Sequence, residues 1–105
     1  MEAIESRDLL DQEFCWTAEG IGAVPIENAN FDAYFYSNSG SQDLVAKFTE
    51  FSIEDAYKGL FRMQASIDFL NTCFKDGDTV TLIVTGQLPN TGRTPICKRK
   101  VIKCH

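Results

Sequence analysis

The sequence predicts a mainly β fold, a small antiparallel β-sandwich with one short helix. Apolar and polar residues alternate in four separate segments, which is the pattern of half-buried strands. Clusters of Gly, Asn, Asp, Ser and Pro separate these segments, as expected for turns between strands. With 105 residues, 44% of them hydrophobic, the chain suffices for one ordinary core, and we expect a single domain over residues 1–105.

The first part of the chain is the least clearly patterned. Residues 1–13 are rich in acids, and they fit either a flexible arm or a short helix capped by Ser6. After Trp16, the glycine-rich stretch 19–25 predicts a loop or an irregular strand.

A hairpin is predicted next. Aromatic and polar residues alternate over residues 31–36, and the alternation resumes over residues 43–51. The turn-forming residues 38–41 lie between the two segments. The face of the second strand that we expect to be buried carries Leu44, Ala46 and Phe48.

Residues 52–74 fit two patterns at once. Apolar residues recur at steps of three and four from Ala56 to Phe74, which is typical of a helix. Residues 61–69 also alternate strictly, which is typical of a strand. Gly59 lowers the stability of a helix by about 1 kcal/mol relative to Ala.

The combined pattern favours three short elements. We predict a turn at 52–57, a strand at 59–64, and a short helix that starts at a Ser66 cap and ends near Phe74. The alternative is an α+β fold, in which one longer helix over 52–74 packs on an antiparallel sheet.

The clearest strand covers residues 79–88, where β-branched residues dominate. A reversal at 89–92 leads to an antiparallel partner strand over 94–104. The basic cluster 98–100 on that strand suits a sheet edge, because charge discourages pairing with other chains. The face of the first strand that we expect in the core carries Val80, Leu82 and Val84.

The second half of the chain also carries a resemblance. It contains an apolar strand, a Ser-led helical turn, the run Asp-Gly-Asp-Thr-Val-Thr-Leu-Ile-Val-Thr-Gly-Gln-Leu and a return strand. In this pattern, residues 59–104 resemble the C-terminal half of immunoglobulin-like β-sandwich modules, which occur as accessory domains in bacterial and archaeal surface proteins. The basic cluster departs from the acidic and apolar residues common in such modules. The resemblance implies a sandwich and no catalytic residue.

The charges are distributed unevenly. The net charge is −5, but residues 1–55 carry twelve acidic and two basic side chains, and residues 56–105 carry eight basic and three acidic ones. Either the two halves attract each other within the fold, or the basic end meets an acidic partner. Nucleic acid is a poor candidate partner, because the pI is about 4.7 and the basic strip has no aromatic residue for base stacking.

Residue chemistry argues against catalysis, metals and cofactors. The single histidine, His105, is the terminal residue, and a general base needs a fixed position. Cys97, Cys104 and His105 lack the usual spacing of a zinc site. Gly20 and Gly22 lack the third glycine of a dinucleotide fingerprint. We therefore expect a non-enzymatic protein without metal or cofactor.

The cysteines and the hydropathy indicate a compartment. Cys15, Cys73, Cys97 and Cys104 are scattered, which favours reduced thiols and a cytoplasmic location. An extracellular location is the alternative if the chain is an excised domain. No apolar run approaches the roughly 18 residues that span a bilayer, so no membrane contact is expected.

These observations favour a protein-interaction module of the inhibitor, immunity, adaptor or small-subunit type. Its partner would be another protein or a second copy of this chain. The candidate binding residues are Tyr34 and Tyr36, which share a strand face, and the basic Lys98, Arg99 and Lys100. The alternative function is an extracellular immunoglobulin-like accessory module or a carbohydrate-contacting sandwich.

Overall fold

The computed structural model describes residues 3–20, 22–37, 43–75 and 78–103, and it confirms the prediction of a mainly β fold with one short helix. Strands account for 56% of the described residues. In chain order the elements are β1 (Ala3–Glu5), the 3-10 helix η1 (Ser6–Leu10), β2 (Gln12–Cys15), β3 (Thr17–Ala18), β4 (Gly22–Ala23), β5 (Asn30–Ser37), β6 (Leu44–Phe48), β7 (Phe51–Asp55), β8 (Leu60–Met63), α1 (Ile67–Cys73), β9 (Thr79–Gln87) and β10 (Arg93–Ile102).

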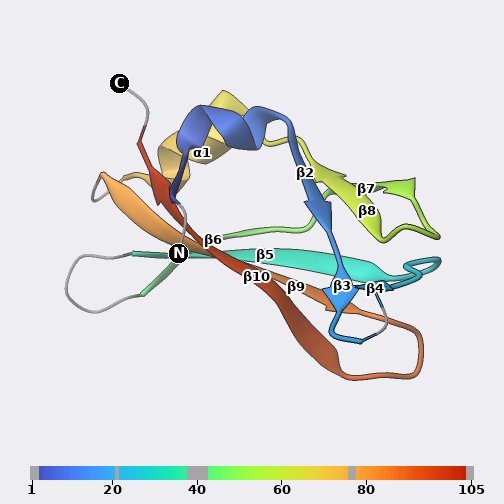
Figure 1. Cartoon of the computed structure of the whole chain (residues 1–105). Coiled ribbons are helices and arrows are strands. Elements are labelled where there is room, and N and C mark those ends of the chain that lie inside the picture. The colour runs from blue at the N-terminus through green and yellow to red at the C-terminus, as the bar shows by residue number, and fades with distance from the viewer. Residues whose placement is uncertain (1–2, 21, 38–42, 76–77, 104–105) are drawn as a thin grey trace.

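Two sheets form the body of the molecule, and a short hairpin of β3 and β4 joins them at one end (Figure 1). The larger sheet has the strand order β1-β10-β9-β5-β6, and the smaller one has the order β2-β8-β7. All pairs are antiparallel except β1 with β10. The smaller sheet, η1 and α1 cover one face of the five-stranded sheet, and no described element lies over its opposite face (Figure 1).

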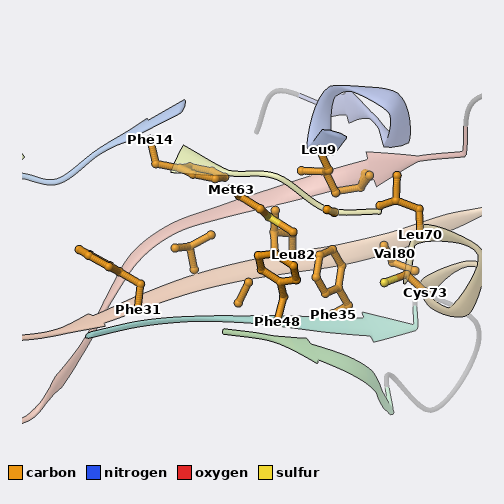
Figure 2. Packing of buried hydrophobic residues seen from close by; sticks show 14 of the residues in the cluster. Leu9, Phe14, Phe31, Phe35, Phe48, Met63, Leu70, Cys73, Val80 and Leu82 are labelled. Atoms are coloured by element: carbon orange, nitrogen blue, oxygen red, sulfur yellow. The ribbon is translucent and has the colours of Figure 1, made fainter. Parts of the chain in front are cut away.

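The core lies between these layers and is rich in phenylalanine (Figure 2). Phe31 of β5 stacks on Phe61 of β8, with ring centroids 4.0 Å apart and planes 11° apart. Phe14 of β2 stacks on the same Phe61 ring at 5.5 Å. Leu82 of β9 is completely buried, so the predicted core face of residues 80–84 is confirmed.

Helix α1 closes one end of the core, and it starts where the sequence predicts. The Ser66 side chain accepts a hydrogen bond of 3.1 Å from the backbone N–H of Phe69, which satisfies one of the free donors at the helix start. Leu70 and Cys73 point into the core. The predicted strand at 59–64 is also present, as β8.

The predicted turn at 52–57 is wrong, and so is the alternative of one long helix over 52–74. β7 occupies residues 51–55 and pairs with β8, with Phe51 opposite Met63 and Ile53 opposite Phe61. The turn comes later, because the Asp55 carboxylate accepts hydrogen bonds from the backbone N–H groups of Tyr57 and Lys58.

The N-terminal residues are an integral part of the fold. Residues 3–13 form β1, η1 and the start of β2, and Leu9 is completely buried. The predicted short helix is present as η1, but its N-cap residue is Glu5 rather than Ser6. Glu5 donates its backbone N–H to the Asp8 carboxylate at 3.0 Å.

The pairing of β1 also changes the position of β10. Ala3 to Glu5 lie alongside Lys100 to Ile102, so β1 and not β10 is the edge of the sheet there. The predicted edge position therefore holds only for residues 93–99, where the described part of the chain pairs β10 with β9 alone. The sequence could not show this, because the paired residues lie almost a hundred positions apart.

Candidate binding face on the five-stranded sheet

Both predicted tyrosines and two of the three predicted basic residues lie on the same face. Across β5, β9 and β10, Tyr34 is opposite Ile83, and Ile83 is opposite Lys98. In the next row, Tyr36 is opposite Thr81, which is opposite Lys100. Residues directly opposite each other in a sheet project from the same face. The tyrosines and lysines are therefore two strand spacings apart, or about 10 Å.

This face is the uncovered one. Leu82, which alternates with Thr81 and Ile83, is completely buried, so its neighbours in β9 must project to the opposite side. Lys98 and Lys100 are exposed, and Tyr34 and Tyr36 are half-buried. Figure 1 shows no element covering this side of the sheet.

Arg99 does not belong to this face, in contrast to the sequence prediction that grouped it with its neighbours. Arg99 is opposite the buried Leu82, so its side chain projects from the face of the sheet that carries Leu82. There it lines a groove of about 210 Å³ with Phe14 and Cys97. Burial raises the pKa of the Cys97 thiol, although the nearby Arg99 charge acts in the opposite direction.

Sequence reasoning missed apolar neighbours of the candidate residues. Ile102 continues the outward row of β10 and is 41% exposed. Leu44 is the register partner of Tyr36 and is 52% exposed, although we expected it to be buried with Phe48. A register shift beside Phe35 changes the alternation of β6 at this point, and the sequence carries no clear signal for it.

Two acids on this face, Glu5 and Asp32, already have cationic partners, and Glu5 pairs with Arg7 at 2.8 Å. The Asp32 carboxylate lies 3.1 Å from the Arg93 guanidinium and 4.0 Å from the Lys47 ammonium. Lys47 also lies over the Tyr34 ring, 5.6 Å from its centroid. Within the described residues, no ion pair involves Lys98 or Lys100. The face therefore carries excess positive charge.

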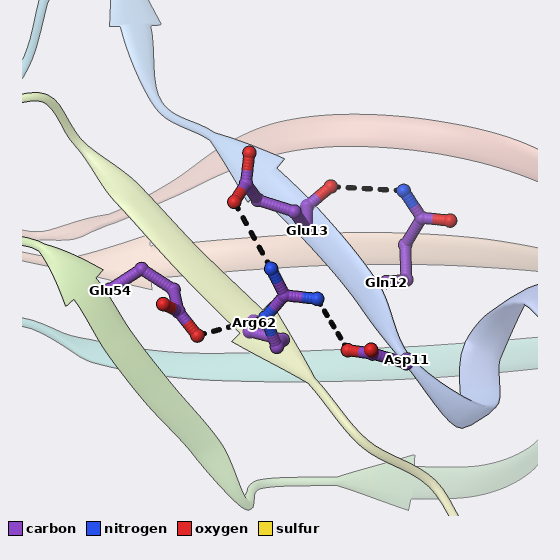
Figure 3. Close-up of polar contacts among 5 residues, drawn as sticks. All are labelled: Asp11, Gln12, Glu13, Glu54 and Arg62. Atoms are coloured by element: carbon purple, nitrogen blue, oxygen red, sulfur yellow. Dashed lines mark hydrogen bonds and ion pairs between the residues drawn. The ribbon is translucent and has the colours of Figure 1, made fainter.

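The outer face of the smaller sheet is acidic (Figure 3). The Arg62 guanidinium of β8 contacts the carboxylates of Asp11, of Glu13 at 3.2 Å and of Glu54 at 2.8 Å. Hydrogen bonds to Asp11 and Glu54 raise the pKa of the Arg62 guanidinium above its ordinary value. One guanidinium thus serves three carboxylates, and this surface keeps excess negative charge.

The first interpretation of the uneven charge, attraction between the two halves of the chain, therefore holds in part, and the second stays a prediction. Arg62 and Arg93, from the basic half of the chain, pair with acids of the first half. Lys98 and Lys100 pair with none within the described residues, so they remain available to an external group.

A larger groove of about 370 Å³ opens at the end of this face. Asn30, Asp32 and Arg93 line it on one side, and Phe51 and Ile53 line it on the other. Its two charged side chains form an ion pair with each other. They therefore offer little unsatisfied charge to a ligand.

Of the three residues whose spacing argued against a zinc site, only Cys97 lies in the described part of the chain. Cys104 and His105 lie outside the described residues. In the described ranges, no group of three or more His, Cys, Asp or Glu side chains is arranged to hold a metal ion. Cys15, Cys73 and Cys97 are free thiols. Over the same ranges, no helix has the length and hydropathy needed to cross a membrane.

Comparison with known proteins gave no relative: no protein-family model matches the chain, and neither does any curated protein. The resemblance of residues 59–104 to immunoglobulin-like modules therefore stays a prediction.

Proposed function

We propose that this chain is a non-enzymatic protein-interaction module that binds an acidic protein surface. The binding surface is the uncovered side of the five-stranded sheet, which we call the Tyr–Lys face. Its residues are Tyr34, Tyr36, Leu44, Lys47, Ile83, Lys98, Lys100 and Ile102.

The observation that carries the proposal is the arrangement of residue types. Two tyrosines and Ile83 lie near the middle of the face, and Lys98 and Lys100 lie beside them on β10. Protein interfaces commonly combine an apolar, tyrosine-rich centre with a polar rim. The lysines lack internal partners in the described residues, so a carboxylate of the partner would not have to displace an existing ion pair.

The size of the face favours a transient complex. It extends over three strand spacings from β6 to β10, or about 14 Å, and over about 14 Å along β10 from Lys98 to Ile102. A standard stable interface buries about 800 Å² on each partner. The Tyr–Lys face is smaller, so we expect fast exchange between the bound and free states.

Site-specific photo-crosslinking in host cells tests whether this face meets a partner. A benzophenone amino acid replaces Tyr36 in one variant. In the control variant it replaces Tyr57, which is 81% exposed on the turn between β7 and β8. We expect an acidic protein to be captured at position 36 and not at 57. Capture of the same protein only at position 57 would contradict the proposal.

Binding kinetics with the purified partner then separate the two parts of the face. Tyr36→Ala should raise the dissociation rate, because removal of a central aromatic side chain can cost about 2 kcal/mol or more. Replacing Lys98 and Lys100 by Ser should lower the association rate, mainly at low salt. Tyr57→Ala is the matched control. Wild-type kinetics in both variants, with the fold intact, would place the interface elsewhere.

A further inference from the structure

A third groove lies away from the Tyr–Lys face, between η1 and α1. These two helices lie side by side at the top of Figure 1. The groove has a volume of about 290 Å³. The residues that line it are Ser6, Arg7, Ile67, Leu70, Asn71, Phe74 and Lys103.

The floor of this groove is apolar and incompletely covered. Leu70 and Phe74 form part of the core and present only a small surface to the groove. Ile67, the first residue of α1, is 59% exposed and is the most exposed aliphatic side chain in the described ranges. An exposed isoleucine above two buried apolar residues provides a place for one more apolar side chain.

The polar groups at the groove are cationic or neutral. Arg7 lies on the η1 side, where its guanidinium pairs with Glu5 at 2.8 Å. Lys103 follows β10, and its backbone N–H donates to the Asp78 carbonyl at 2.8 Å, which fixes its position. In the described part of the chain, no ion pair involves Lys103 and no acid lines the groove. The groove is therefore complementary to an anion.

The volume restricts the kind of occupant. Pockets for small-molecule ligands and cofactors usually measure about 300–1,000 Å³. This groove lies just below that range, so it suits a single side chain and its neighbour better than a whole cofactor. An apolar side chain would contact Ile67 and Phe74, and an adjacent carboxylate would reach Lys103 and the Asn71 amide.

From these features we infer that the groove between η1 and α1 binds a peptide segment of another protein, with a leucine-sized side chain next to a carboxylate. The groove does not depend on the Tyr–Lys face, and a partner could engage either surface alone. Where both surfaces contact one partner, the second contact would raise the overall affinity without any change in the first.

A nuclear magnetic resonance titration with a short peptide tests this inference. The probe is the acetylated, amidated hexapeptide Gly-Gly-Leu-Glu-Gly-Gly, added to the ¹⁵N-labelled full chain. We expect saturable shifts for the backbone amides of Ile67, Leu70, Asn71 and Lys103. Peptides with Ala in place of Leu, or Gln in place of Glu, should bind at least fivefold more weakly.

Protein variants then assign the contacts. Ile67→Ser and Lys103→Gln change exposed or half-buried side chains and should retain the fold, while lowering peptide affinity at least fivefold. Tyr36→Ala should leave the affinity for the peptide unchanged, which would show that the peptide does not bind at the Tyr–Lys face. The inference is overturned by any of three results: no saturable shifts at 10 mM peptide, equal binding of all three peptides, or shifts centred on Tyr34 and Lys98.

Discussion

The benzene ring of the Trp16 indole packs directly against Gly86. A methyl group at position 86 would lie 2.5 Å from Cζ3 of Trp16 and 2.8 Å from Cδ1 of Ile96. No side chain larger than hydrogen fits there without displacing the ring. This contact holds the chain after β2 against β9, and it gives the first prediction.

Gly86→Ala should destabilise the fold by about 1–3 kcal/mol, which is the usual cost of overpacking a tightly packed site. Urea unfolding followed by the fluorescence of Trp16, the only tryptophan of the chain, measures the change. Gly92→Ala is the control, because nothing lies within 4 Å of a methyl group at that position. Its free energy of unfolding should stay within about 0.5 kcal/mol of the wild type. Equal effects of the two substitutions would contradict this role of Trp16.

Leu82→Ala should lower the free energy of unfolding by about 2–5 kcal/mol, since Leu82 is completely buried between the layers. Leu44→Ala removes the same atoms from an exposed position and should change stability by less than about 1 kcal/mol. Chemical denaturation of both variants tests the assignment of faces. A change under about 1 kcal/mol for Leu82→Ala would mean that the core face of β9 is wrong.

Arg62→Gln should lower the thermal midpoint at neutral pH, because Asp11, Glu13 and Glu54 would then repel each other without a shared cation. The loss should shrink in 1 M salt, where the Debye length falls to about 3 Å. Arg99→Gln is the control, since Arg99 donates only to the neighbouring Lys98 carbonyl in the described structure. A midpoint loss independent of salt would contradict the electrostatic explanation.

The free energy of unfolding should fall at alkaline pH because of the buried Cys73 thiol. Burial raises the pKa of its thiol from 9.0 to about 12, so between these values the unfolded chain releases a proton that the folded chain retains. Stability is therefore complete below pH 9 and falls as the pH rises toward 12. Between pH 8 and pH 10, the wild type should lose about 1.4 kcal/mol more than Cys73→Ala.

Urea unfolding at the two pH values measures this difference. Cys15→Ala, which removes an exposed thiol, is the matched control and should lose stability as the wild type does. Parallel losses in the wild type and Cys73→Ala would show that the Cys73 thiol does not cause the effect.

Several elements followed from the sequence because their chemistry is local. The strand at 79–88 shows uninterrupted alternation of β-branched residues, and the helix after Ser66 has its own cap. β7 was missed because most of its residues were assigned to a turn at 52–57, and only the pairing with β8 shows that they form a strand. Strand alternation alone places Arg99 on the face opposite to Lys98 and Lys100. The prediction grouped the three residues because they are adjacent and share a positive charge.

The sequence by itself determined the mainly β class and the faces of β5 and β9. Only the tertiary structure decided that β1 covers part of β10 and that Tyr34 and Lys98 share one face. The physical reason is that side-chain alternation is fixed within a strand, whereas strand order and register depend on contacts between distant segments. A face built from four strands, such as the Tyr–Lys face, therefore becomes visible only once those strands are paired.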